Sequence, residues 1–208
     1  MRLTGTAPGA TCRDCAAWPA AIRAARAAAV LEPPADRLVH ELKYRGWRSL
    51  AEPMAAAMAR VRLPEDAQRE ATVVVPVPTT RKRRRKRGYN QAEELARGYA
   101  FASGRRCLPL LVRRGESGTQ TSLQPLERAA NVAGAFELAV DAHAQVRGQH
   151  LLLVDDVMTT GATAGAATGV DARDVTPAAA PATTAAVATP VTRDFRVTAF
   201  LSICLTSL

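Results

Sequence analysis

Two adjacent carboxylates, Asp155 and Asp156, stand between a short apolar run and a cluster of hydroxyl side chains. The apolar run is 151–154, and four apolar residues in succession are typical of a strand buried on both faces of a parallel sheet. In an open α/β sheet, ligands bind beyond the carboxyl ends of the strands. We therefore expect a ligand site after this strand, formed by the carboxylates and by Thr159, Thr160, Gly161, Ala162 and Thr163.

The residue types in this stretch suit a sugar phosphate. Threonines around one glycine offer hydroxyl and backbone N–H donors to a phosphate, and a helix opening in the Ala-rich segment 164–168 adds a favourable dipole. Hydrogen bonds to a charged group contribute roughly 1.5–3 kcal/mol each, so a few of them anchor a phosphate monoester. Asp155 and Asp156 have the wrong sign for that phosphate, but they suit sugar hydroxyls or a metal-bound pyrophosphate. The alternative is an acidic turn before a capped helix.

The 208 residues suffice for one domain with a small extra subdomain, and 48% of them are hydrophobic.

One segment of the chain is strongly basic. The net charge is +9, of which the run Arg81–Arg87 alone supplies seven positive charges. A cluster of this kind indicates phosphate or nucleic acid as a partner, and the alternative is a solvated loop.

Apolar runs and cysteines bear on where the chain resides. No apolar run reaches the roughly 18–20 residues that a membrane span needs. Residues 1–10 lack the features of a signal peptide, so we expect a cytoplasmic protein.

Cys12 and Cys15 form a Cys-x-x-Cys pair, which is half of the ligand pattern of a zinc ribbon. A structural zinc needs four ligands. A bound zinc and a reduced thiol pair are therefore both open.

Helices are predicted on either side of the basic run. Helical spacing begins at Asp36 and stops near Gly46, and the Ser49-x-x-Glu52 pattern is a capping box for a second helix. These two helices are expected to be structural, packing on the sheet. The alternative for the intervening residues 43–46 is contact with the ligand. After the basic run, Asn90 is the predicted N-cap of another helix.

Strands are predicted before and after that last helix. The β-branched run 72–78 predicts a buried strand stopped by its prolines, which would bring the basic run to the same sheet edge as Asp155. Further strands are expected at 107–112 and 136–138. The long polar segment 113–131 between them is a candidate lid.

Several motifs resemble known families. The string from Leu151 to Thr163 resembles the phosphoribosyl pyrophosphate (PRPP) motif of type I phosphoribosyltransferases. More of the chain resembles the ComF (competence protein F) family, which is phosphoribosyltransferase-like and associated with DNA uptake. That resemblance covers residues 38–163 and rests on four blocks in order: Leu42–Gly46, Val75–Pro78 with Arg87–Ala92, Thr119–Phe136, and the Asp155–Thr163 loop.

The resemblance implies an α/β fold: a type I phosphoribosyltransferase-like parallel sheet flanked by helices, with an atypical C-terminal part. The expected domain spans residues 36–170, after an N-terminal remnant of a zinc-ribbon-like segment at 1–35. The family pattern stops after Thr163, and the Ala/Thr/Pro-rich residues 171–208 are expected to form a poorly ordered tail, consistent with a frameshift. The alternative for part of this tail is that Phe195–Leu205 adds a strand.

The resemblance also implies a function. Asp155 and Asp156 would contact the ribose as catalytic residues, and residues 159–163 would bind the 5′-phosphate of PRPP. Arg87 and Arg128 are the further substrate-binding candidates, and Mg²⁺ is the expected cofactor, neutralising the pyrophosphate. The expected activity is phosphoribosyl transfer to an unidentified acceptor. The alternative is a non-catalytic accessory protein of natural transformation, with DNA or competence-machinery proteins as partners of Arg81–Arg87.

Overall fold

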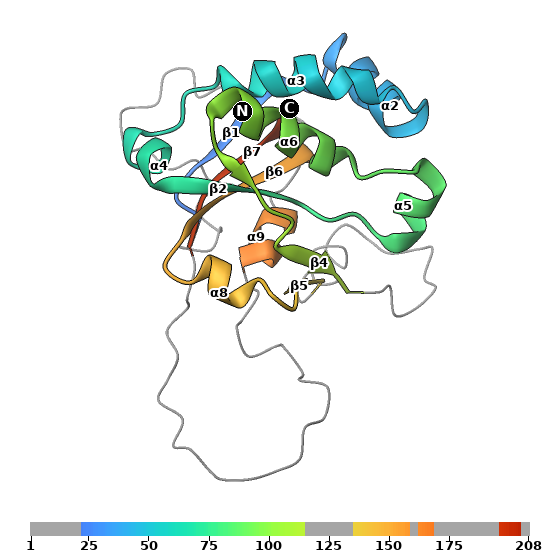
Figure 1. Cartoon of the computed structure of the whole chain (residues 1–208). Coiled ribbons are helices and arrows are strands. Elements are labelled where there is room, and N and C mark those ends of the chain that lie inside the picture. The colour runs from blue at the N-terminus through green and yellow to red at the C-terminus, as the bar shows by residue number, and fades with distance from the viewer. Residues whose placement is uncertain (1–21, 115–134, 159–161, 169–195, 205–208) are drawn as a thin grey trace, which may run out of the picture.

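A parallel sheet forms the centre of the computed structural model, which describes residues 22–114, 135–158, 162–168 and 196–204 (Figure 1). Five strands pair in the order β1-β7-β6-β2-β3, and all of these pairings are parallel. They are β1 (Ala25–Val30), β7 (Arg196–Cys204), β6 (His150–Met158), β2 (Ala71–Pro76) and β3 (Arg106–Cys107). A separate antiparallel pair consists of β4 (Leu111–Arg113) and β5 (Phe136–Leu138).

Helices flank the sheet. In Figure 1, α2, α3 and α6 lie above the sheet, whereas α8, α9 and the β4–β5 pair lie below it. The predicted α/β fold, a parallel sheet flanked by helices, is thereby confirmed. The helices, including the 3-10 turn η1, are α2 (Ala35–Tyr44), η1 (Arg48–Leu50), α3 (Ala51–Ala59), α4 (Glu65–Glu70), α5 (Arg81–Arg87), α6 (Gln91–Ser103), α8 (His143–Val146) and α9 (Ala162–Thr168).

The neighbouring strands β2 and β6 are buried on both faces of the sheet, as their apolar runs predict. Side chains of successive strand residues point to opposite faces. On β6, Leu152 and Val154 join the core beneath α2, α3 and α6, whereas Leu151 and Leu153 join the core on the other face. Burying a side chain of this size stabilises the fold by about 1.5–3 kcal/mol. This two-sided burial fixes the strand that carries the acidic pair.

A close helix contact sets the position of α6. A Cβ atom added at Gly98 would lie 2.7 Å from the Cβ of Ala55 on α3. Any side chain at position 98 would therefore push α6 away from α3. Glycine at this position lets α6 pack tightly, with Leu95 and Ala96 fully buried beside it.

The sheet extends beyond the residues 36–170 that the sequence predicts for the domain. β1 comes from the segment before residue 36, and it pairs with β7. β7 comes from the Ala/Thr/Pro-rich tail and inserts between β1 and β6, so the described part of the alternative strand, Arg196–Cys204, does add to the sheet. Over the described ranges, no helix has both the length and the apolar character needed to cross a bilayer.

Three local predictions are wrong in detail. The Ser49 capping box does not form, because Ser49 lies inside η1 and Leu50 precedes α3 without any side-chain cap. The strand expected at 107–112 is split into β3 and β4. Asn90 does precede α6, but its side-chain Nδ2 donates to the Val77 carbonyl at 3.0 Å instead of capping the helix. That carbonyl follows the end of β2, so Asn90 joins the strand end to the helix.

Candidate functional site

A cavity of about 260 Å³ lies where β2, β6, α2, α5 and α6 meet. Asp155 and Asp156 of β6 line it, as does Thr163 of α9. Its cationic lining residues are Lys43, Arg83, Arg87 and Arg113. Four cationic side chains therefore surround two carboxyl groups, and the cavity favours an anionic ligand.

The acidic pair lies at an irregularity in the strand. Val154 of β6 is opposite Leu201 of β7, and Val157 is opposite Ile203, so β6 contains one extra residue between these pairs. In a regular strand, neighbouring side chains point to opposite faces, whereas a bulge changes the direction of one of them. This irregularity explains how both carboxyl groups line one cavity. The strand continues to Met158, so the pair lies within β6 rather than after it.

Burial changes the proton affinity of Asp155. Burial, and then the neighbouring Asp156 carboxyl group, raise the pKa of Asp155 to about 8. The backbone N–H of Asp156, which donates to Asp155 Oδ1 at 2.8 Å, and the charge of Lys43 act in the opposite direction. Near neutral pH, Asp155 therefore retains its proton in the ligand-free protein. This proton leaves the cationic side chains in still greater excess within the cavity.

Lys43, at the end of α2, pairs with the acidic residues. Its Nζ lies 3.0 Å from Asp156 Oδ1, and the two side chains are only 20% and 13% exposed. At this degree of burial the ion pair is screened less than a surface pair. Lys43 therefore holds Asp156 at the cavity wall.

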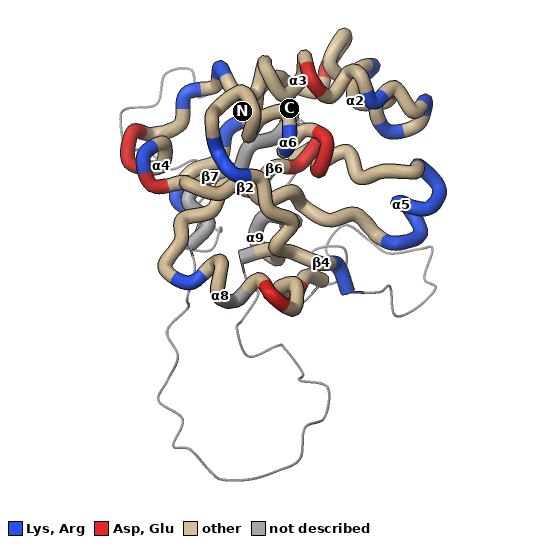
Figure 2. Tube along the Cα trace, viewed as in Figure 1, with Lys and Arg blue, Asp and Glu red and all other residues tan. Residues whose placement is uncertain are grey.

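The basic run forms the helix α5 rather than a solvated loop. Arginine and lysine are good helix formers, and the Thr80 hydroxyl caps the first turn by accepting from the Arg83 N–H at 3.2 Å. Gly88 ends the helix with a left-handed φ of 83°, which glycine adopts without strain. Figure 2 shows α5 as a cationic segment at the edge of the molecule.

Only part of α5 faces the cavity. Arg83 and Arg87 line it, and Arg87 is the half-buried member of the helix. The Arg87 guanidinium donates from Nη1 to Gln91 Oε1 at 2.9 Å, and its Cζ lies 5.0 Å from the centre of the Tyr44 ring. These contacts hold Arg87 between α2 and α6.

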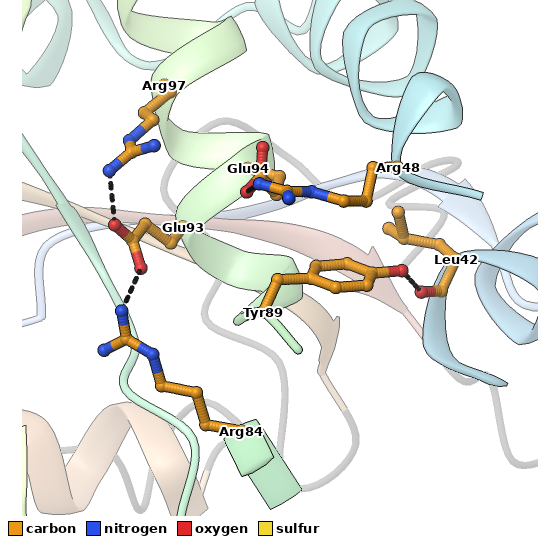
Figure 3. Close-up of polar contacts among 7 residues, drawn as sticks. All are labelled: Leu42, Arg48, Arg84, Tyr89, Glu93, Glu94 and Arg97. Atoms are coloured by element: carbon orange, nitrogen blue, oxygen red, sulfur yellow. Dashed lines mark hydrogen bonds and ion pairs between the residues drawn. The ribbon is translucent and has the colours of Figure 1, made fainter. Parts of the chain in front are cut away.

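The first turns of α6 brace both neighbouring helices (Figure 3). Glu93 lies 3.9 Å from Arg84 of α5 and 2.6 Å from Arg97 of α6. Glu94 pairs with Arg48 of η1. Each exposed pair of this kind contributes little by itself, about 0–1 kcal/mol, but together they fix α5 and η1 against one helix.

Tyr89 connects the start of α6 to α2. Its hydroxyl donates to the carbonyl of Leu42, and Arg48 lies over its ring at 5.1 Å. Burial raises the pKa of Tyr89, which keeps the hydroxyl protonated as a donor. Because Leu42 precedes Lys43 and Tyr44, this bond holds the end of α2 at the cavity.

The structure brings together some of the predicted site residues. Asp155, Asp156, Thr163 and Arg87 line the same cavity, and Ala162 begins α9 beside it in the chain. Thr159, Thr160, Gly161 and Arg128 lie outside the described residues, as do most of the candidate lid and the cysteine pair Cys12 and Cys15.

Sequence reasoning missed several lining residues. Lys43 and Tyr44, for which a ligand contact was only the alternative to a structural role, both line the cavity, and so does Gln91. The available signal was their place in blocks 42–46 and 87–92, which resemble ComF proteins.

Mg²⁺ fits this site as an ion that accompanies its ligand. Over the described ranges, no group of three or more His, Cys, Asp and Glu side chains is placed to hold a metal ion. Mg²⁺ in phosphate-transfer sites is usually bound by one or two carboxylates together with substrate phosphates. The two adjacent carboxyl groups, Asp155 and Asp156, match that donor set.

The curated proteins that are similar to this chain carry two different names, DNA utilization protein YhgH and Competence protein F. The chain is 34% identical over 141 residues to the DNA utilization protein YhgH of Salmonella typhi, a match covering 63% of this chain and 58% of the relative. It is 30% identical over 150 residues to YhgH of Escherichia coli K12, with the same shares covered. It is 33% identical over 129 residues to Competence protein F of Haemophilus influenzae, covering 62% of this chain and 51% of the relative.

These relatives confirm the resemblance to the ComF family. The chain spans only somewhat more than half the length of the curated relatives that it matches. No protein-family model matches the chain, and no solved structure matches it.

Proposed function

We propose that this ComF relative binds PRPP with Mg²⁺ and transfers the phosphoribosyl group to an acceptor, releasing pyrophosphate. One observation carries the proposal: a single cavity combines an acidic pair at a strand irregularity, a threonine of the PRPP-like motif and several cationic side chains. Such a cavity suits a ligand that has sugar hydroxyls together with more than one anionic group.

In the proposed step, a bond forms between an acceptor nitrogen and C1 of the ribose. The bond from C1 to the pyrophosphate oxygen breaks, and its electron pair leaves with pyrophosphate, while the acceptor gives up its proton to solvent. Positive charge develops on the ribose, and the carboxylate of Asp156 stabilises it, as does Asp155 in its ionised form. Bound Mg²⁺ would supply charge neutralisation at the diphosphate.

The cationic side chains of the cavity would act on a different part of the ligand from the acidic pair. Arg83 and Arg87 would hold the diphosphate, and Lys43 would orient Asp156 toward the ribose. Residues 159–163 would bind the 5′-phosphate, as the motif implies. Catalysis would then consist of positioning and electrostatic stabilisation, with no general acid or base assigned.

A turnover assay tests the transfer half of this proposal. The purified chain is incubated with PRPP, Mg²⁺ and a panel of nitrogenous bases, and pyrophosphate release is measured. We expect release that depends on one class of base and is lost in the double variant Asp155→Asn/Asp156→Asn. Release equal to that of protein-free solution, by a chain that binds PRPP, would contradict the transfer step and leave a PRPP-binding protein.

A second candidate function is DNA binding through the outer side of α5. Arg81, Lys82, Arg85 and Lys86 are exposed, and no acidic side chain of the described part pairs with them. The relatives' names, DNA utilization protein and Competence protein F, support a link between this chain and DNA. Tyr89 and Tyr99 are buried and cannot stack on bases, whereas Phe101 near the end of α6 is exposed.

Salt dependence tests the DNA-binding candidate. If four cationic side chains neutralise phosphates of the DNA backbone, the logarithm of the Kd for DNA rises steeply with the logarithm of the salt concentration. A variant with Arg81, Lys82, Arg85 and Lys86 changed to Gln should lose much of that slope while retaining PRPP affinity. An unchanged slope would exclude this face as the DNA-binding surface.

A further inference from the structure

Gln91 has an unusual position in the cavity wall. It is the first residue of α6, it is 2% exposed, and it lines the cavity. In the described ranges, its Nε2 is the only buried side-chain N or O atom without a hydrogen-bond partner. Buried polar groups are nearly always paired, so an unpaired one calls for an explanation.

The contact with Arg87 fixes which end of the amide is unpaired. A guanidinium only donates hydrogen bonds, so the Gln91 atom that accepts from Arg87 Nη1 at 2.9 Å must be the oxygen. The nitrogen is therefore the other end, and it has two N–H groups to donate. A flipped amide would set two donors against each other, which excludes that assignment.

We propose that Gln91 Nε2 donates to an oxygen of the diphosphate group of the ligand, so that Gln91 selects ligands that have this group over simple sugar phosphates. The inference rests on the proposed function and extends it to a residue without an assigned role. Gln91 lies on the α5–α6 side of the cavity, beside Arg83 and Arg87, where cationic charge is concentrated. Thr163, which belongs to the expected 5′-phosphate loop, lies on α9.

The charge around Gln91 identifies the kind of acceptor. Arg83, Arg87 and Lys43 line the same cavity, so an oxygen that reaches Nε2 is in a field that favours negative charge. A hydrogen bond to a charged oxygen is roughly twice as strong as one between neutral groups. An anionic diphosphate oxygen therefore uses both the unpaired donor and the neighbouring guanidinium groups.

Two substitutions separate ligand binding from a structural role. Gln91→Glu keeps an oxygen for Arg87 and replaces the donor by a second acceptor, whereas Gln91→Met removes both functions at similar volume. Gln145→Glu makes the same charge change on the exposed surface of α8 and serves as the control. The full chain is titrated calorimetrically with PRPP and Mg²⁺, and separately with ribose 5-phosphate.

We expect both Gln91 variants to bind PRPP roughly 10- to 100-fold more weakly, the range expected for one hydrogen bond to a charged group. Their affinity for ribose 5-phosphate should stay at the wild-type value, and Gln145→Glu should change neither affinity. PRPP affinity in Gln91→Glu equal to that of the wild type would overturn the inference alone. So would an equal loss for both ligands, since that result indicates a structural role. A folded wild type that does not bind PRPP would overturn the proposed function as well.

Discussion

The acidic and the cationic parts of the cavity are held in place by different means. Asp155 and Asp156 belong to a strand that pairs on both sides, with β2 and with β7, so backbone hydrogen bonds and a two-sided core determine their position. Arg83 and Arg87 belong to an exposed helix, which side-chain contacts to α6 and α2 hold in place.

This difference indicates how each part responds to substitution. Changes at the acidic pair alter charge within a fixed backbone, so their effects should be confined to binding and to proton equilibria. Changes at Arg87 remove the proposed ligand contact together with the observed contacts to Gln91 and Tyr44. Two experiments sharpen the comparison.

Among single substitutions, the larger effect on PRPP binding is expected at the cationic part. Arg87→Ala should weaken PRPP binding by roughly 10- to 100-fold, because it removes a charged hydrogen-bond donor and leaves Gln91 Oε1 without its partner. Arg87→Lys should recover only part of this loss, since lysine restores the charge without the planar guanidinium. Calorimetric titration measures both.

Arg85→Ala is the matched control for Arg87. It removes the same charge from the same helix, at an exposed position that does not line the cavity. PRPP affinity should be unchanged in this variant. If both substitutions weaken PRPP binding equally, the overall charge of α5 matters and the orientation of Arg87 does not.

At the acidic part, the effect expected of a single substitution is on stability. The pKa of Asp155 is about 8 in the folded protein and 3.8 for an ordinary aspartate. Between these values the folded protein keeps a proton that the unfolded chain has lost, so the free energy of unfolding falls as pH rises from about 4 to about 8. Asp155→Asn should remove this decline and be more stable than the wild type above pH 8, by roughly 1–3 kcal/mol.

Denaturant unfolding at a series of pH values measures this decline. Asp141→Asn, which changes an exposed carboxyl group, is the control and should follow the wild type. A wild-type free energy of unfolding that stays flat between pH 4 and pH 8 would show that Asp155 ionises normally in the folded protein.

The sequence predicts the acidic part of the site better than the cationic part. The apolar run 151–154 specifies a doubly buried strand, so the position of Asp155 beside it follows from local pattern alone. The irregularity at Asp155–Asp156 could not be predicted, because it depends on the register with β7. That register could not be read from the residues around β7, because their composition resembles that of a low-complexity tail.

The cationic part depends on contacts between distant segments. Helical spacing places Lys43 and Tyr44 near the end of a helix without giving them partners, and only the tertiary fold brings them to Asp156 and Arg87. The unpaired nitrogen of Gln91 likewise depends on the contact with Arg87 and on burial. Individual side-chain partners of this kind have no signature in a single sequence.

The central claim is that this cavity binds PRPP through the acidic pair. Calorimetric titration of the purified chain with PRPP and Mg²⁺, beside the Asp155→Asn/Asp156→Asn variant, tests it most directly. We predict saturable binding of one PRPP by the wild type and loss of that binding in a variant that unfolds at a similar or higher temperature. Equal binding by both proteins, or no binding by the folded wild type, would contradict the claim.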